Sequence, residues 1–396
     1  MTQTLPSLNL ASRMSRLGTE TAFEVLARAK QLESEGRDIV HLEIGEPDFD
    51  TPANIVEAGR QALAEGWTHY GPAAGLPDAR EAVAHYVATT RGTSVNGNEV
   101  CIVPGGKPVM FYALLALAEA GDEVIFPDPG FPIYESMIRF AGAKAVGCPI
   151  RESNGFALDP QDVISRLTEK TKLVILNSPA NPTGGVTGRT QLEEVLAALR
   201  NRPDVWILSD EIYSRLLYDG AEHVSPLSDP SIRDRVILLD GFSKTWAMTG
   251  WRIGFGVMRQ DLCEAITKLM INSNSCTASF TQRAAIEALQ GDQSDVEKMH
   301  AKFDKRRKHI VGLLNEIPGF SCHLPKGAFY VMPNIRELGM TAKELQDRLL
   351  LEAGVAALAG TAFGAEGEGY LRFSYATDIP TIEKGLGRVR EFVEAL

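Results

Sequence analysis

The sequence lacks a cysteine pattern, a membrane-length apolar run and a secretory leader. Its five cysteines are odd in number and follow no metal-ligand or redox spacing: Cys101, Cys148, Cys263, Cys276 and Cys322. We therefore expect small hydrophobic side chains in a reducing compartment, not disulfides. Residues 1–18 contain no apolar core of signal-peptide length, and no stretch approaches a membrane span. These absences predict a cytoplasmic protein.

An excess of positive charge is absent as well. The formal net charge of -11 argues against a nucleic-acid surface, which needs clustered lysine and arginine. The one basic cluster, residues 302–308, falls inside a long helical pattern, so we interpret it as a solvated helix face. With 44% apolar and 23% charged residues, the composition is that of a folded protein. A length of 396 residues exceeds what one core supports and predicts two domains.

Strand and helix patterns alternate along the middle of the chain. Strands are predicted at 100–103, 123–126, 143–149, 173–176, 205–208, 236–239 and 253–257. Helices are predicted between them at 108–120, 132–140, 160–168 and 190–199. Unbroken apolar strands separated by helices predict an α/β fold with a doubly wound, mostly parallel sheet covered on both faces.

Beyond residue 257 the pattern becomes helical and then mixed. Helices are predicted at 261–271, 277–289, 294–316, 341–352 and 379–396, with strands at 320–332 and 370–375. Earlier in the chain, we expect a strand at 38–44 and helices at 21–35, 53–65 and 77–90. The predicted division is a large domain at 51–290 and a small α+β domain at 291–396, to which residues 1–50 contribute.

The loops after the predicted strands carry polar and glycine-rich residues. Ligands of such sheets bind at the carboxyl ends of the strands, so these loops are the candidates for a site. Pro104-Gly105-Gly106-Lys107 is a tight turn before a helix, which offers free backbone N–H groups to a phosphate. The glycine spacing matches neither a Walker loop nor the full dinucleotide fingerprint. That mismatch argues against a nicotinamide dehydrogenase.

Lys244 stands in a loop with apolar neighbours, Phe242, Trp246 and Met248. Burial in an apolar pocket would lower the pKa of its amine, and an unprotonated amine can form a Schiff base with an aldehyde. The alternative is a lysine that only packs its stem along the loop. From this stretch alone, both interpretations stay open.

Three motifs in order, Asn181-Pro182-Thr183-Gly184, Asp210-Glu211-Ile212-Tyr213 and Ser243-Lys244 followed by Gly250-Trp251-Arg252, resemble those of class I/II aminotransferases. These are fold type I pyridoxal-phosphate enzymes of the aspartate aminotransferase type, and the resemblance covers nearly the whole chain. It implies a transaminase that passes an amino group between an L-amino acid and a 2-oxo acid, of aspartate/glutamate or alanine type. It also implies pyridoxal 5′-phosphate as cofactor and a homodimer.

The resemblance assigns a role to each candidate residue. Lys244, Asp210 and Tyr213 would be catalytic. The cofactor would be bound by Gly105, Gly106, Lys107, Phe131, Asn181, Asp210, Tyr213, Ser243, Lys244 and Arg252, together with Tyr70 of a neighbouring subunit. The substrate would be bound by Gly45, Asn181 and Arg372.

The chain departs from aspartate-specific bacterial forms at three places. It has Leu17-Gly18-Thr19-Glu20 before the first helix, Phe131 at the stacking position and Ala359 before Gly360. Lys107 matches a residue that contacts a second substrate carboxylate in relatives, but it is equally suited to a phosphate. The side-chain preference therefore stays open. A carbon–sulfur β-lyase on the same scaffold and a non-catalytic binding module are the alternatives.

Overall fold

A computed structural model describes residues 8–396 of the chain, so the first positions of the predicted N-terminal segment, 1–7, lie outside it. The helices are α1 Thr21–Ser34, α2 Ala53–Ala64, α3 Pro77–Arg91, α4 Lys107–Leu117, α5 Ile133–Ala141, α6 Pro160–Ile164, α7 Arg189–Arg200, α8 Gln260–Ile271, α9 Ser279–Gln290, α10 Ser294–Asn315, α11 Ala342–Arg348 and α12 Ile379–Glu394. The strands are β1 Val40–His41, β2 Val100–Val103, β3 Glu123–Asp128, β4 Lys144–Pro149, β5 Thr171–Asn177, β6 Trp206–Asp210, β7 Val236–Gly241, β8 Gly254–Val257, β9 Tyr330–Val331, β10 Val355–Ala356, β11 Leu358–Ala359 and β12 Leu371–Ser374.

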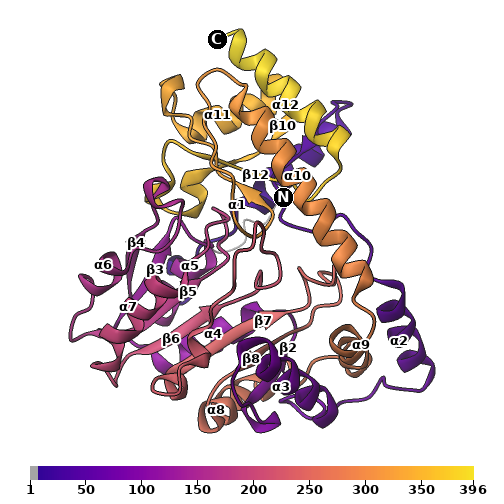
Figure 1. Ribbon diagram of the computed structural model, residues 1–396, viewed down its shortest axis with the longest axis vertical. Coiled ribbons are helices and arrows are strands. Elements are labelled where there is room, and N and C mark those ends of the chain that lie inside the picture. Colours follow the sequence, from indigo (N-terminus) through magenta and orange to yellow (C-terminus); the bar gives the residue numbers. More distant parts are fainter. Residues whose placement is uncertain (1–7) are drawn as a thin grey trace, which may run out of the picture.

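A seven-stranded sheet forms the centre of the lower body in Figure 1, in the order β2-β8-β7-β6-β5-β3-β4. The pairs formed by β3, β4, β5, β6 and β7 are parallel, whereas β8 runs antiparallel to both β2 and β7. The predicted α/β fold with a mostly parallel sheet is therefore confirmed.

Helices cover both faces of this sheet. Along β7, Val236 and Leu238 point into a core shared with α3, α7 and α9. Ile237 and Leu239 point to the other side, into a core shared with α4, α5 and α8. All four side chains are buried. Full burial of such a side chain contributes about 1.5–3 kcal/mol to stability. Because both faces of the sheet are covered, every position along the strand is buried, and the strands are unbroken apolar runs in the sequence.

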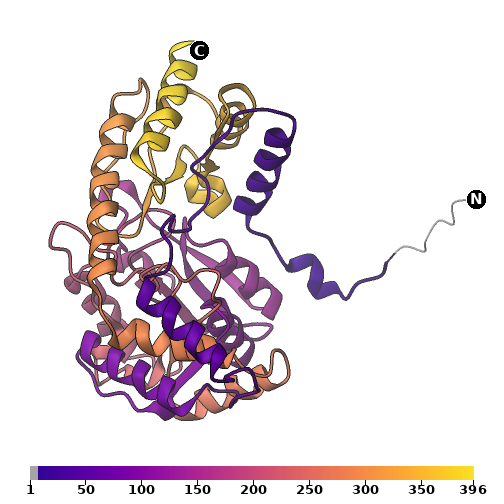
Figure 2. The same cartoon turned by 90° about the vertical axis from the view of Figure 1, so that its right-hand side faces the viewer.

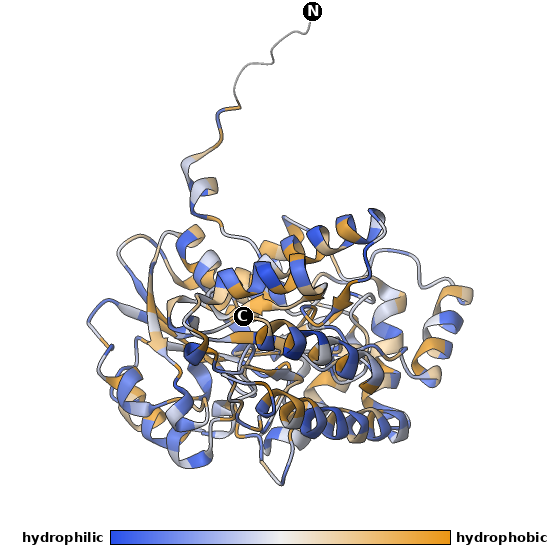
Figure 3. Ribbon diagram, turned by 90° about the horizontal axis from the view of Figure 1, so that it is seen from above, coloured by the Kyte–Doolittle hydropathy of each residue, from blue (hydrophilic) through white to orange (hydrophobic). Residues whose placement is uncertain are grey.

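The upper part of the molecule is built around two small sheets. One has the order β11-β12-β9, and the other pairs β1 with β10. In Figure 1, α10 runs from the lower body up to this part, where it packs against α12. Helix α1 packs there too, since Val25, Ala29 and Leu32 share a core with Leu350 and Phe363. Figures 2 and 3 show the described part of the segment before α1, residues 8–20, at the edge of the body, where Ser12–Arg16 lies against α5.

Three expectations about local structure were wrong in extent. The predicted strand at 320–332 is only β9, because Pro325 and Gly327 interrupt it and the chain makes isolated bridges instead. Most apolar residues of this run, such as Phe320, Phe329 and Met332, are buried in the core without belonging to one continuous strand. The strand expected at 38–44 is only β1, and α6 stops at Ile164. No described helix has the length and hydropathy that a membrane crossing requires.

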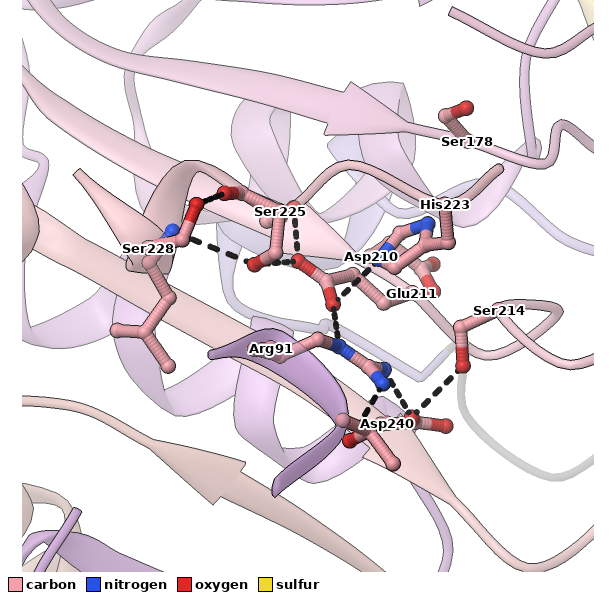
Figure 4. A network of polar contacts seen from close by, with 12 residues as sticks. Arg91, Ser178, Asp210, Glu211, Ser214, His223, Ser225, Ser228 and Asp240 are labelled. Atoms are coloured by element: carbon pink, nitrogen blue, oxygen red, sulfur yellow. Dashed lines mark hydrogen bonds and ion pairs between the residues drawn. The ribbon is translucent and has the colours of Figure 1, made fainter. Parts of the chain in front are cut away.

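A buried ionic network joins α3 to the ends of β6 and β7 (Figure 4). Arg91 donates from Nε to Glu211 Oε2 at 2.7 Å and from Nη2 to Asp240 Oδ2 at 2.9 Å. His223 and Ser225 also contact the Glu211 carboxylate, at 2.8 Å and 2.5 Å. Although burial opposes ionisation, His223 and Arg91 hold the pKa of Glu211 well below its ordinary value.

We predict that Arg91→Met lowers the free energy of unfolding by about 3–5 kcal/mol, because it leaves two buried carboxylates without their cation. Urea denaturation followed by circular dichroism measures this loss. Arg28→Met is the matched control, since Arg28 is exposed on α1, and it should change stability by less than about 0.5 kcal/mol. Equal effects of the two substitutions would contradict a structural role for the network.

Candidate active site

A cavity of about 340 Å³ lies at the carboxyl ends of β5, β6 and β7. The register of the sheet brings these ends together, because Asn177 pairs with Asp210 and Asp210 pairs with Leu239. Most of the residues predicted for the site line the cavity: Gly45, Gly106, Lys107, Phe131, Asn181, Asp210, Tyr213, Ser243, Lys244, Arg252 and Arg372. Residues far apart in the sequence thus share one cavity.

Lys244 follows β7 and is half-buried. Its Nζ donates to the backbone oxygen of Gly45 at 2.6 Å and lies 5.7 Å from the centre of the Phe329 ring. Burial lowers the pKa of the amine to about 8, and the charge of Glu46 opposes that shift. An amine with this pKa is partly unprotonated near neutral pH. Of the two interpretations of Lys244, this arrangement favours the reactive amine.

Asp210 ends β6 and carries its carboxylate at the base of the cavity. Tyr134 on α5 donates to Oδ2 at 2.7 Å, and the Ile212 amide donates to Oδ1 at 3.3 Å. Asn177 donates to the Asp210 backbone oxygen at 3.1 Å and so ties the two strand ends together. Burial raises the pKa of Asp210 to about 6, while the Tyr134 hydrogen bond lowers it. The carboxylate is therefore mostly ionised at neutral pH.

The opposite corner of the cavity is built to hold an anion. Gly106 and Lys107 stand at the N-terminus of α4, where helix N–H groups are free and the dipole is positive. The Ser243 hydroxyl and the Arg252 guanidinium line the same cavity. Gly105 has a φ of +84°, and a Cβ there would come within 2.3 Å of Arg252 Nη2. The positive φ favours glycine at this position, and the guanidinium lies directly against it.

Arg372 on β12 lies in an almost fully buried position, 3% exposed. Its guanidinium lies 4.4 Å from the Tyr330 ring centre and 4.6 Å from that of Phe363. It donates to Asn181 Oδ1 at 3.1 Å and to the backbone oxygen of Glu43. Its Nε is buried with no partner among the described residues. Because a buried unpaired donor is costly, this atom fits a ligand carboxylate.

Tyr213 lies between the two halves of the site. Its hydroxyl and that of Tyr330 are 2.8 Å apart, and burial raises the pKa of Tyr213 well above its ordinary value. Phe131 packs edge-on against Tyr134, with ring centres 5.7 Å apart. Aromatic side chains thus wall the cavity between the Asp210 carboxylate and Arg372.

Two predicted residues take no direct part in this cavity. Tyr70 lies on the surface with 91% of its area exposed, so its assignment to a neighbouring subunit stays a prediction. Gly105 acts through the space that it leaves for Arg252. No group of three metal-ligating side chains occurs in the described part of the chain.

Sequence reasoning missed three residues of the site: Tyr134, Tyr330 and Glu20. Tyr134 and Tyr330 occur in apolar stretches, where tyrosine is typical of a core. Glu20 stands out in the sequence only as part of Leu17-Gly18-Thr19-Glu20, where the chain departs from aspartate-specific forms. It lines the cavity and forms an ion pair with Lys107. A carboxylate just before a helix gave no signal that it faces a pocket.

We predict that Lys244 reacts with a small aldehyde in the presence of borohydride with a midpoint near pH 8, because the unprotonated amine is the nucleophile. Peptide mapping by mass spectrometry follows each lysine separately, so the exposed Lys170 serves as an internal control for the labelling reaction. Glu46→Gln should move the Lys244 midpoint lower, since the charge of Glu46 raises this pKa. A Lys244 midpoint matching that of Lys170 would contradict the buried amine.

Comparison with known proteins gives consistent matches over almost the whole chain. The family model for aminotransferase class I and II matches residues 37–389. An aspartate aminotransferase of Pyrococcus horikoshii is 40% identical over 390 residues, which cover 97% of each chain.

Solved structures agree with this result. The aspartate aminotransferase of Thermus thermophilus with maleate has a TM-score of 0.93 and 36% identity, covering 98% of this chain and 100% of that one. The alanine aminotransferase of Pyrococcus furiosus has a TM-score of 0.92 and 31% identity, with the same coverage. The chain therefore belongs to the aminotransferase class I and II family.

Proposed function

We propose that this aminotransferase depends on pyridoxal 5′-phosphate and passes an amino group between an L-amino acid and a 2-oxo acid. One observation carries the proposal: the amine of Lys244, with its pKa lowered to about 8, shares a cavity with a buried carboxylate and an anion-binding corner. The names of the related proteins support aspartate/glutamate or alanine as the substrate type.

The residues of the cavity fit this cofactor. When bound, pyridoxal phosphate supplies an aldehyde that links to amines and a ring that draws electrons from the adjacent carbon. Asp210 would hold the ring nitrogen, Tyr213 and Asn181 the phenolic oxygen, and Phe131 the ring face. The phosphate would be bound by the backbone at Gly105, Gly106 and Lys107 and by the side chains of Ser243 and Arg252.

Arg372 would bind the substrate, and Lys244 would transfer its proton. Arg372, with its free Nε, would hold the α-carboxylate in a fork, and the backbone at Gly45 would contact the same group. Lys244 would then take the proton from the substrate Cα and deliver it to C4′, the aldehyde carbon of the cofactor. A pKa near 8 suits this task, because the amine can both accept and release a proton near neutral pH.

The proposal extends to the assembly and location of the protein. We infer a homodimer in which Tyr70, exposed in its own chain, reaches the phosphate of the partner's site. We also infer a cytoplasmic location and a division into a large domain, 51–290, and a small one, 291–396, to which residues 1–50 contribute. A β-lyase would use the same Lys244 and Asp210, but no observation favours it over a transaminase.

We predict that Lys244→Ala lowers kcat by at least about 10²–10⁴-fold, since the acid–base group is lost. The wild-type protein loaded with cofactor should change its absorbance with an amino donor and recover it with oxaloacetate or pyruvate. Lys170→Ala, on an exposed loop, is the control and should behave as wild type. Normal turnover by Lys244→Ala would refute the mechanism, and steady release of ammonia with pyruvate would instead support the lyase.

We also predict that Tyr134→Phe moves the acid limb of kcat/KM to higher pH. The Tyr134 hydrogen bond lowers the pKa of Asp210, so its loss raises that pKa further above about 6. An ionised Asp210 would hold the protonated ring nitrogen, so activity should fall as the pH drops through the pKa of Asp210. Tyr112→Phe is the control, because the Tyr112 hydroxyl bonds to Ser273 and Asn274 instead. An unchanged acid limb in Tyr134→Phe would contradict this role of Asp210.

A further inference from the structure

Glu20 stands immediately before α1 and turns its carboxylate toward the cavity. Its side chain makes no capping hydrogen bond to its own helix and instead contacts Lys107 Nζ. The segment is held in place two residues earlier, where the Gly18 amide donates to Ser136 Oγ on α5 at 2.8 Å. The Glu20 side chain is only 15% exposed. An acidic side chain from the N-terminal segment thus forms part of the cavity wall.

Four cationic side chains line the cavity, and Glu20 pairs with one of them. Lys244 and Arg372 are the reactive amine and the carboxylate clamp, and Arg252 lies against Gly105 in the anion corner. Within the described residues, none of these three forms an ion pair with a carboxylate, whereas Lys107 does. The one cation left for the side chain of a substrate is therefore already neutralised by the protein itself.

Aromatic side chains lie near this ion pair, in which the Lys107 side chain is 44% exposed. Lys107 Nζ lies 5.4 Å from the centre of the Phe131 ring. Phe23, one turn into α1, and Phe363, beside Arg372, line the same cavity. A second carboxylate on a substrate would have to displace Glu20 from Lys107 and then remain next to a like charge. An uncharged substrate side chain would neither break the Glu20–Lys107 ion pair nor place a second negative charge beside Glu20.

We propose that Glu20 is a specificity-determining residue that disfavours dicarboxylic substrates, so that the enzyme prefers amino acids with uncharged side chains. This inference rests on the proposed transaminase function and selects the alanine type over the aspartate/glutamate type. Lys107 is in this arrangement a partner of Glu20 and not a ligand for a second substrate carboxylate.

The charge of Glu20 also acts on the interior of the site. Burial lowers the pKa values of both Lys244 and Arg372. The negative charge of Glu20 opposes this effect and raises both pKa values. Lys244 additionally senses Glu46, which raises its pKa, and Arg372 and Lys107, which lower it. Removing the charge of Glu20 should therefore move the aldehyde-labelling midpoint of Lys244 below that of the wild type.

The test compares two ligands that have no amino group, using holoenzyme and calorimetry. Maleate carries two carboxylates, and 3-phenylpropionate carries one carboxylate and an uncharged side chain. Glu20→Gln and Glu20→Ser should each bind maleate about tenfold more tightly, because Lys107 is freed and a like charge is lost. Binding of 3-phenylpropionate should change less than about threefold. The ratio of kcat/KM for aspartate to that for alanine should rise in parallel.

Two further variants serve as controls. Glu24→Gln removes a negative charge from the exposed side of the same helix and should leave the maleate affinity unchanged. In the double variant Glu20→Gln with Lys107→Gln, the gain in maleate affinity should disappear. The proposal is overturned if both Glu20 variants leave the maleate preference unchanged or weaken it, or if Glu24→Gln produces the same gain.

Failure of the underlying function would look different. If the wild-type holoenzyme transfers no amino group from aspartate, alanine or any other amino acid, the transaminase proposal fails. If transfer is normal and aspartate is preferred irrespective of residue 20, only the role of Glu20 fails.

Discussion

Parallel pairing of β5, β6 and β7 is the constraint on which the site depends. It places the carboxyl ends of three strands at one edge, so that Asn177, Asp210 and the loop with Lys244 face one cavity. The apolar faces of these strands are packed under helices on both sides, which fixes the edge in position. Functional side chains from distant parts of the chain lie close together there, because the packed strands hold their loops at fixed positions.

Burial gives the groups at this edge their reactivity. The same loss of solvent lowers the pKa of Lys244 to about 8 and raises that of Asp210 to about 6, since each shift favours the neutral form. Arg372 remains a cation in a nearly dry position and keeps one donor unpaired. Such groups cost stability unless a ligand satisfies them, which is typical of an active site rather than of a structural core.

Buried ion pairs also hold the scaffold around this site. Arg91 forms ion pairs with both Glu211 and Asp240, and Glu211 is the neighbour of Asp210 in the chain. Buried charges in this protein are thus of two kinds, those in ion pairs within the scaffold and those that face the cavity. Ion pairs hold the strand ends, whereas Lys244, Asp210 and Arg372 face the cavity without an ion-pair partner among the described residues. Glu20 belongs to neither group, because it comes from the N-terminal segment and balances a cation at the cavity wall.

The sequence by itself determined the alternation of strands and helices, the motif residues and the family resemblance. The spacing of hydrophobic residues and the glycine turn at 104–107 are local properties of the sequence. They therefore predict the ends of β2 and α4 to within a few residues. Only the tertiary structure decided that Tyr134 bonds to Asp210, that the 320–332 run is not one strand, and that Glu20 reaches Lys107. These outcomes depend on which surfaces meet across long stretches of chain, and no local pattern encodes a contact 87 residues away.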